Sequence, residues 1–201
     1  MKKIDGWYWP DGDEKSHKAR YQEMLSALDE TLALVDKQGA CIQAGGAVGI
    51  WPQYLSQRFD EVYTFEPDEQ QFECLSHNVK ANNVHAYRAA LGESPGYVGT
   101  VHHQDRCNAS HVDDGGSGVP RILLDSIAVK TPVAFVCLDC EGYELFALRG
   151  GEDVLIRDKP VVQVEDKHGD RFGVGPNDID DYMNSLGYTL HSEYKFDKVF
   201  V

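Results

Sequence analysis

Cys41-Ile42-Gln43-Ala44-Gly45-Gly46-Ala47-Val48-Gly49-Ile50-Trp51 is the stretch that decides the fold. An apolar run ends at Gln43, three glycines follow within five positions, and an amphipathic segment begins at Gly49. This order predicts a buried strand, a tight turn and a helix. Glycine suits such a turn because it takes positive φ and lets the backbone approach a ligand closely. Backbone amides at the start of the following helix favour a polar or anionic ligand group.

The next strand supports a nucleoside-binding site. Val62-Tyr63-Thr64-Phe65-Glu66 is a short apolar run that ends in a carboxylate, and an acid there can accept hydrogen bonds from a ribose diol. Glycines at such a junction also occur for turn geometry alone, but the strand-end acid favours a cofactor. The dinucleotide fingerprint G-x-G-x-x-G, aligned to end at Gly49, would need glycine where Ala44 stands. The sequence therefore supports NAD less well than other nucleoside-containing cofactors, without excluding it.

Composition narrows the partners and the compartment. The 201 residues include 19 Lys plus Arg against 33 Asp plus Glu, a net charge of -14. Such a surface repels phosphate backbones and anionic membranes, so we expect no nucleic-acid partner and no membrane partner. The five cysteines lie mostly in apolar runs, which is typical of reduced thiols in a cytoplasmic protein. Met1-Lys2-Lys3 is followed by no apolar core, so we expect no signal peptide.

Two regions are expected along the chain. Residues 1–39 form an N-terminal aromatic segment and a helix at about 16–38, and residues 40–201 form one domain. Trp7, Tyr8 and Trp9 are predicted to cap the core in preference to stacking on a substrate. In the polar loop 105–118 and its flanks, histidines and aspartates match no metal-site spacing, so a solvated loop is favoured there.

Strands and helices alternate through the second region, which predicts a parallel sheet with helices on both faces. Strands are expected to end at Gln43 and to cover 62–66, about 84–89, 97–102, 133–139 and 160–165. Helices are expected at about 49–58, 68–81, 145–151 and 177–186. The last two apolar-aromatic runs, 188–194 and 198–201, predict an antiparallel hairpin that a plain dinucleotide-binding sheet would not have.

Asp139-Cys-Glu-Gly-Tyr-Glu144 resembles the D-x-E-G-x-E segment at the end of the fourth strand in the FkbM family of S-adenosylmethionine-dependent methyltransferases. The resemblance covers roughly residues 40–201 and extends to Phe65-Glu66-Pro67, Leu124-Asp-Ser-Ile127, Leu148-Arg-Gly-Gly151 and Val164-Glu165. It implies a Rossmann-like class I methyltransferase fold, with a seven-stranded, mostly parallel sheet, a C-terminal antiparallel hairpin and helices on both faces. It also implies methyl transfer to oxygen, often to a hydroxyl of a sugar or secondary metabolite.

The resemblance assigns S-adenosylmethionine to one row of residues. Gly45 and Gly49 would admit the methionine part, Glu66 would hold the ribose, and Ala90-Leu91 would flank the adenine. The full set is Gln43, Gly45, Gly46, Gly49, Glu66, Pro67, Ala90, Leu91 and Asp139.

The chain departs from the family's usual D-x-G-A-N-x-G motif at two positions, where it has Gln43 and Ala47. The family's acid helps to hold the cofactor's ammonium, whereas an amide accepts a hydrogen bond without bringing charge. Replacing Gln43 by Asp or Glu is therefore expected to tighten cofactor binding.

Methylating a hydroxyl requires a base or a metal close to it. Asp139, Glu165 and His168 are the candidate catalytic residues. Transfer without a metal is favoured; if a divalent cation is used, Asp139, Glu165 and Asp166 would hold it. The acceptor is expected to be a small molecule or a glycan. Two alternatives stay open: an NAD-type oxidoreductase and a cofactor-binding protein without catalysis. The acceptor's identity and the oligomeric state do not follow from the sequence.

Overall fold

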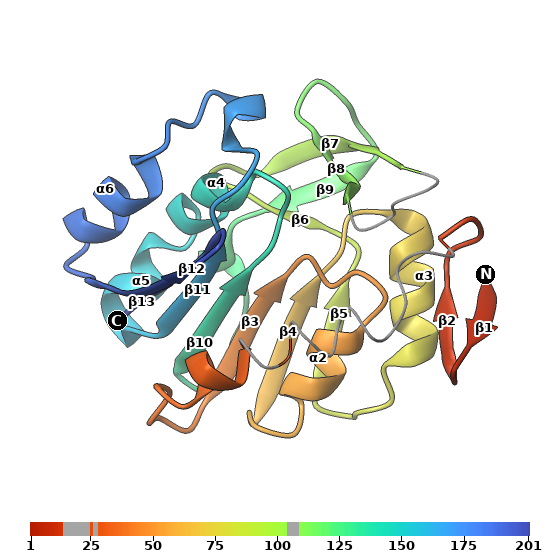
Figure 1. Ribbon diagram of the computed structural model, residues 1–201, viewed down its shortest axis with the longest axis horizontal. Helices are drawn as coiled ribbons and strands as arrows, with labels where there is room; N and C mark the ends of the chain where they lie inside the picture. Colours follow the sequence, from red (N-terminus) through yellow and green to blue (C-terminus); the bar gives the residue numbers. More distant parts are fainter. Residues whose placement is uncertain (14–24, 26–27, 104–108) are drawn as a thin grey trace.

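The computed structural model describes residues 1–13, 25, 28–103 and 109–201, and a mixed sheet forms its centre (Figure 1). Its strands are β3 Ala40–Ala44, β4 Glu61–Phe65, β5 Val84–Tyr87, β10 Val133–Leu138, β11 Val161–Glu165, β12 Leu190–Tyr194 and β13 Asp197–Phe200. Within the described residues the order is β12-β13-β11-β10-β3-β4-β5. β13 runs antiparallel to both of its neighbours, and the other neighbouring pairs are parallel. The expected mostly parallel sheet with a reversed last hairpin is confirmed.

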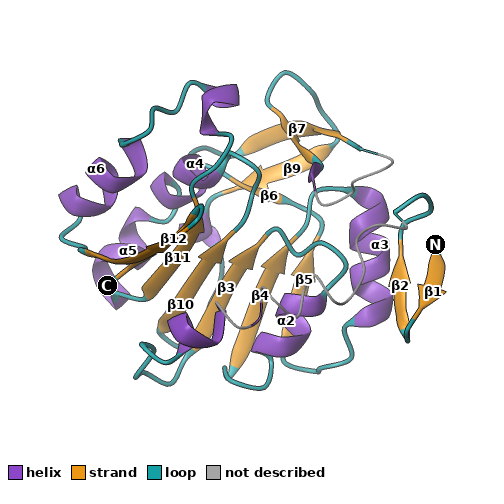
Figure 2. Ribbon diagram, in the orientation of Figure 1, coloured by secondary structure: helices purple, strands orange, loops and turns teal. Residues whose placement is uncertain are grey.

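Helices cover both faces of this sheet (Figure 2). They are α2 Ile50–Leu55, α3 Glu69–Asn78, α4 Glu144–Arg149, α5 Glu152–Asp158 and α6 Asp178–Ser185. The expected helix at 145–151 is thus the start of two consecutive helices, α4 and α5.

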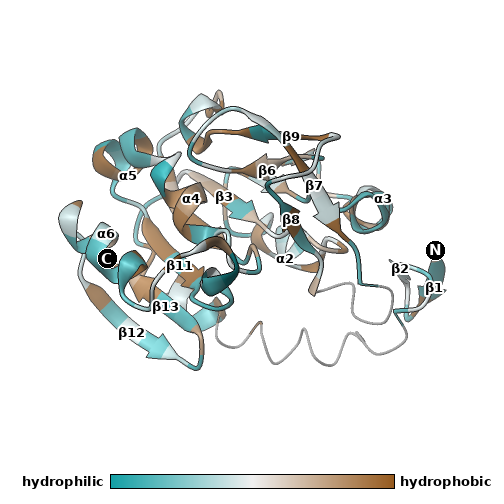
Figure 3. Cartoon of the chain, turned by 90° about the horizontal axis from the view of Figure 1, so that it is seen from above, coloured by the Kyte–Doolittle hydropathy of each residue, from teal (hydrophilic) through white to brown (hydrophobic). Residues whose placement is uncertain are grey.

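The central sheet divides the apolar core into two layers, and β3 contributes side chains to both. Successive side chains of a strand point to opposite faces, so Ala40 and Ile42 pack in the layer that holds α4, α5 and α6. Cys41 packs with α2 and α3 on the other face. Figure 3 shows apolar residues gathered on α4 and β11, whereas the edge strand β12 is hydrophilic. Buried on both faces, the central strands hold their carboxyl ends in a fixed row.

The N-terminal aromatics belong to the core. Strands β1 Lys2–Ile4 and β2 Trp7–Trp9 form a hairpin, in which Asp5 and Gly6 take positive φ. The Asn78 side chain on α3 accepts a hydrogen bond from the Tyr8 amide and donates one to the Tyr8 carbonyl. Trp9 is buried with α2 and α3, so the prediction that these aromatics cap the core is confirmed.

The expected helix at 16–38 falls partly outside the described residues, at 16–24 and 26–27. Residues 28–32 are helical, and the chain leaves the helix through tighter bonds from Leu34 to Thr31 and from Val35 to Leu32. The helix ends at Leu32, so the expected end near residue 38 is wrong. Within the described residues, no helix is long and apolar enough to cross a membrane.

A second, smaller sheet is formed by the part of the chain that connects β5 to β10. Its strands are β6 Ala90–Leu91, β7 Gly96–Val101, β8 His111–Asp113 and β9 Val119–Ile122, in the order β6-β9-β7-β8 among the described residues. Figure 1 shows it beyond the carboxyl ends of the central strands. The sequence pattern predicts β7 alone, because the other strands have only two to four residues, too few for a visible alternation.

Candidate functional site

A cavity opens at the carboxyl ends of the central strands, where ligands bind in open α/β sheets. One side is the turn after β3, and the floor includes the ends of β4, β10 and β11. Ser110 and Val112 from the second sheet's region close another side. The lining residues are Ala44–Ala47, Ile50, Trp51, Phe65–Pro67, Gln71, Ala89–Leu91, Ser110, Val112, Asp139–Glu141, Tyr143, Glu165 and Lys167.

Most of the residues that the sequence assigns to the cofactor lie on this cavity. Gly45, Gly46, Glu66, Pro67, Ala90, Leu91 and Asp139 line it. Gln43 and Gly49 are not among its lining residues. Of the catalytic candidates, Asp139 and Glu165 line it, whereas His168 is not among its lining residues.

The glycine turn is shaped by packing inside the protein. A Cβ on Gly45 would stand 1.8 Å from the Asp139 carbonyl oxygen, and one on Gly49 would stand 2.8 Å from Val79 Cγ2. Both residues also have positive φ, 82° and 95°. The amides of Gly45 and Gly46 donate to the Phe65 carbonyl, and that of Gly49 donates to the Gly46 carbonyl. The turn thus gives the cavity its shape, while these amides are already bonded within the protein.

Gln43 is a bonded part of that turn. Its side chain is fully buried, and Nε2 donates to the carbonyl oxygens of Ala44 at 3.1 Å and Gly45 at 2.8 Å. Its Oε1 accepts a hydrogen bond from the Thr64 hydroxyl. Both amide protons are therefore used to fix the backbone, a function that a carboxylate lacks the donors to perform.

Glu66 fastens the turn from the next strand. It is 4% exposed; Oε2 accepts from the Ala47 amide at 2.7 Å and Oε1 from the Asp68 amide at 2.8 Å. Burial raises the pKa of the Glu66 carboxyl to about 7, although these two hydrogen bonds act against the rise. Each carboxylate oxygen has a second lone pair, so both can accept a further donor from the cavity.

The second sheet is tied to the cavity wall at two points. His102 Nδ1 lies 2.7 Å from Asp68 Oδ2, at the start of α3. On the other side the Tyr143 hydroxyl donates to Asp114 at 2.6 Å, and Arg121 donates to both of them. The described part of the loop contains no metal-ligand cluster.

Three carboxylates meet where β10 and β11 reach the cavity. Single oxygens of Asp139, Glu141 and Glu165 lie within 4.8 Å of one another. Burial, together with the charges of Glu165 and Glu141, raises the pKa of Asp139 well above its usual range. Burial also raises the pKa of Glu165. The group differs from the set expected from the sequence to hold a cation, which has Asp166 in the place of Glu141.

Glu144, the last residue of the D-x-E-G-x-E segment, organises the loop that carries these acids. It is 1% exposed, and Oε1 accepts from the amides of Cys140 at 2.7 Å and Gly142 at 3.2 Å. Burial raises the pKa of Glu144 to about 8. Glu141 takes a positive φ of 55° in this loop, which is a strained conformation for a residue with a side chain.

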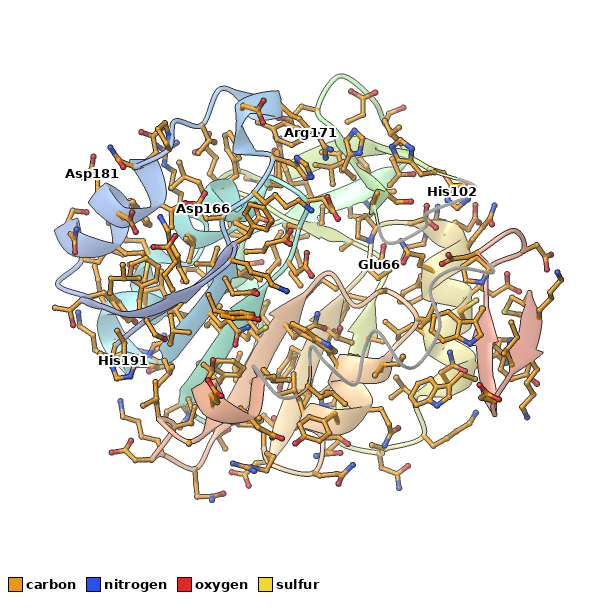
Figure 4. All side chains as sticks on the ribbon, in the orientation of Figure 1. Glu66, His102, Asp166, Arg171, Asp181 and His191 are labelled. Carbon is orange, nitrogen blue, oxygen red and sulfur yellow. The ribbon has the colours of Figure 1, made fainter. Side chains whose placement is uncertain are left out.

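Asp166 and His168 are placed differently from Glu165. The Asp166 carboxylate is 2.7 Å from Lys198 Nζ, and Figure 4 shows it away from Glu66 along the row of strand ends. His168 Nε2 is 3.8 Å from Glu141 Oε2. Burial, together with the charges of Arg171 and Lys167, lowers the pKa of His168, so the imidazole is neutral at pH 7.

A model of the methyltransferase FkbM domain matches residues 43–190, well over half of the chain. The chain belongs to the FkbM methyltransferase family. Its domain is that of an S-adenosylmethionine-dependent methyltransferase, and the class I methyltransferase fold expected from the sequence is confirmed. The family membership gives no support to the NAD-type oxidoreductase. None of the curated proteins compared with the chain matches it.

Solved structures similar to this FkbM-family chain share its fold at low sequence identity. Methyltransferase FkbM from Methylobacillus flagellatus KT is 18% identical at a TM-score of 0.56, covering 84% of this chain and 44% of its own. An rRNA methylase from Streptococcus thermophilus is 14% identical at a TM-score of 0.53, and the match covers 88% of this chain and 93% of the methylase. A third structure is that of a putative methyltransferase from Streptococcus mutans in complex with SAH. It is 14% identical at a TM-score of 0.50, and the match covers 88% of this chain and 94% of the other. The chain thus spans less than half the length of the Methylobacillus protein.

Proposed function

We propose that this protein transfers the methyl group of S-adenosylmethionine to a hydroxyl oxygen of a sugar or another small metabolite, and that residues 40–201 carry this activity. The observation that carries the proposal is the arrangement along one cavity. Glu66, the proposed ribose ligand, follows β4, whereas Asp139 and Glu165 lie at the ends of β10 and β11, on the other side of β3.

The cavity suits the cofactor chemically. The walls at Ala90, Leu91 and Val112 are apolar and suit an adenine ring, while Glu66 offers two oxygens to a ribose diol. The oxygen atoms of the acidic side chains at the far end can accept hydrogen bonds from the ammonium of the methionine part. When bound, S-adenosylmethionine supplies an electrophilic methyl group on a sulfonium centre.

His168 is the proposed base for the acceptor hydroxyl. Its pKa is lowered by burial and by neighbouring cations, so its neutral form has a nitrogen that can accept a proton at pH 7. The raised pKa values of Asp139 and Glu165 keep protons on those carboxyls to higher pH. We assign these two side chains to orienting the acceptor through hydrogen bonds.

The acceptor class rests on charge and on the resemblance. Among the lining residues that the structure describes, Lys167 is the one basic side chain, against four acidic ones, Glu66, Asp139, Glu141 and Glu165. Such a site favours hydroxyl or amine donors over phosphates. Similarity to an rRNA methylase at 14% identity concerns the fold, and the net charge of -14 favours a small acceptor over nucleic acid.

Cofactor identity is tested by isothermal titration of the purified protein with S-adenosylmethionine and, separately, with NAD. The proposal requires saturable binding of S-adenosylmethionine and none of NAD. Methyl transfer is then tested with tritiated cofactor and a panel of sugars and hydroxylated metabolites. Binding without transfer to any hydroxyl would support the non-catalytic alternative.

His168→Ala is expected to lower kcat about a hundredfold or more, since removing a general base typically costs this much. The dissociation constant of S-adenosylmethionine should stay unchanged. His191→Ala is the matched control, because His191 lies exposed on β12 (Figure 4). Equal turnover in the two variants would remove His168 from the reaction.

A further inference from the structure

The three carboxylates at the far end of the cavity come from different parts of the fold. Asp139 follows β10, Glu141 belongs to the loop before α4, and Glu165 ends β11. Oxygens of all three lie within 4.8 Å of one another. If all three were ionised, their charges would repel one another strongly at this spacing in a partly buried site.

Two of the oxygens have no hydrogen-bond partner among the described residues. Glu141 is 8% exposed, and its Oε2 accepts no hydrogen bond; Oε2 of Glu165 accepts none either. Glu141 cannot easily turn away, because Arg171 donates to its backbone carbonyl at 3.2 Å and Glu144 holds the loop. Buried carboxylate oxygens without a donor are costly, so a positive group is expected among them.

Among the described residues, no basic side chain donates a hydrogen bond to either of these two oxygens. His168 Nε2 and Arg171 Nη1 are each 3.8 Å from Glu141 Oε2, too far for a hydrogen bond. Lys198 is held by Asp166 and Asp180, each at 2.7 Å. The described residues therefore leave the two oxygens without a donor.

We propose that Asp139, Glu141 and Glu165 bind a divalent cation of the Mg²⁺ or Mn²⁺ type. Such hard cations prefer oxygen ligands and keep part of their coordination for water or for an oxygen of another ligand. The site borders the cavity, so the remaining positions face incoming ligands. The set differs from the one expected from the sequence, because Asp166 pairs with Lys198 and Glu141 takes its place. The proposal concerns the protein without cofactor and does not depend on methyl transfer.

The test is titration of the EDTA-treated, cofactor-free full chain with Mn²⁺, followed by isothermal calorimetry and by thermal unfolding. We expect binding at a single site. At a Mn²⁺ concentration about a hundredfold above the dissociation constant, the midpoint of unfolding should rise by about 5–10 °C. Absence of binding up to about 5 mM Mn²⁺, beyond the weakest protein sites for such cations, would overturn the proposal.

Substituted proteins can show whether a metal cation or a proton is the positive group that the three carboxylates require. Glu141→Gln should weaken Mn²⁺ binding about tenfold or more and should raise the unfolding midpoint of the metal-free protein, because one repelling charge is gone. Asp166→Asn, the matched control, should leave Mn²⁺ binding unchanged. Equal Mn²⁺ affinity in Glu141→Gln and the unsubstituted protein would overturn the proposal. So would a raised midpoint in Glu141→Gln with no Mn²⁺ binding to either protein, since a proton would then close the cluster.

Discussion

Gln43→Glu is expected to lower the midpoint of thermal unfolding by about 5–20 °C. The side chain donates two hydrogen bonds to backbone carbonyls in a fully buried place, and a carboxylate has no proton to donate. Each carbonyl left without a donor costs about 1–3 kcal/mol, and 1 kcal/mol shifts the midpoint by about 2–4 °C in a chain of this size. The structure therefore predicts a loss of stability from this substitution, whereas the motif predicts a gain in cofactor affinity.

Gln53→Glu is the matched control for this experiment. Its Oε1 accepts hydrogen bonds from the amides of Lys80 and Ala81, and a carboxylate can accept both. We expect a change within about 0.5 kcal/mol there. The loss in Gln43→Glu should shrink toward acidic pH, because a protonated carboxyl regains one donor. A Gln43→Glu protein as stable as the unsubstituted one, with tighter S-adenosylmethionine binding, would instead support an ammonium contact at position 43.

Glu66→Ala is expected to weaken S-adenosylmethionine binding by about tenfold to a hundredfold. Hydrogen bonds to a charged group contribute about 1.5–3 kcal/mol, and tenfold corresponds to about 1.4 kcal/mol. The variant also loses the carboxylate that holds the amides of Ala47 and Asp68, so its unfolding midpoint should fall. Isothermal titration below that midpoint measures the affinity. Glu69→Ala, at an exposed carboxylate three residues along the chain, controls for the loss of charge.

The pH dependence gives a second measure of the same contact. Burial raises the pKa of Glu66 to about 7. Its protonated form therefore favours the folded, cofactor-free protein, and that contribution is lost as pH rises from about 4.5 through about 7. Ribose hydroxyls donate to the ionised form, so affinity for S-adenosylmethionine should rise with pH up to about 7 and then level off. Glu66→Ala should remove this dependence; an unchanged affinity in the folded variant would place Glu66 outside the site.

Local sequence was enough to predict much of the fold. β3, β4, β10 and β11 are apolar runs buried on both faces, and their strand character follows from composition alone. The strand-end acids Glu66, Asp139 and Glu165 lie on one cavity because parallel strands carry their carboxyl ends to the same edge. Topology therefore brings together residues that lie far apart in the chain.

Other features of the site were decided by tertiary contacts. Gln43 stands where the family has an acid, but its bonds to the turn depend on how β3 meets β4. Glu141 joins Asp139 and Glu165 because positive φ turns it toward them, and Asp166 leaves that group because Lys198, from another strand, pairs with it. Periodicity reports which face of an element is buried, and motifs report which residue types are present. The partner of a polar side chain depends on non-local geometry, so it emerged only from the folded chain.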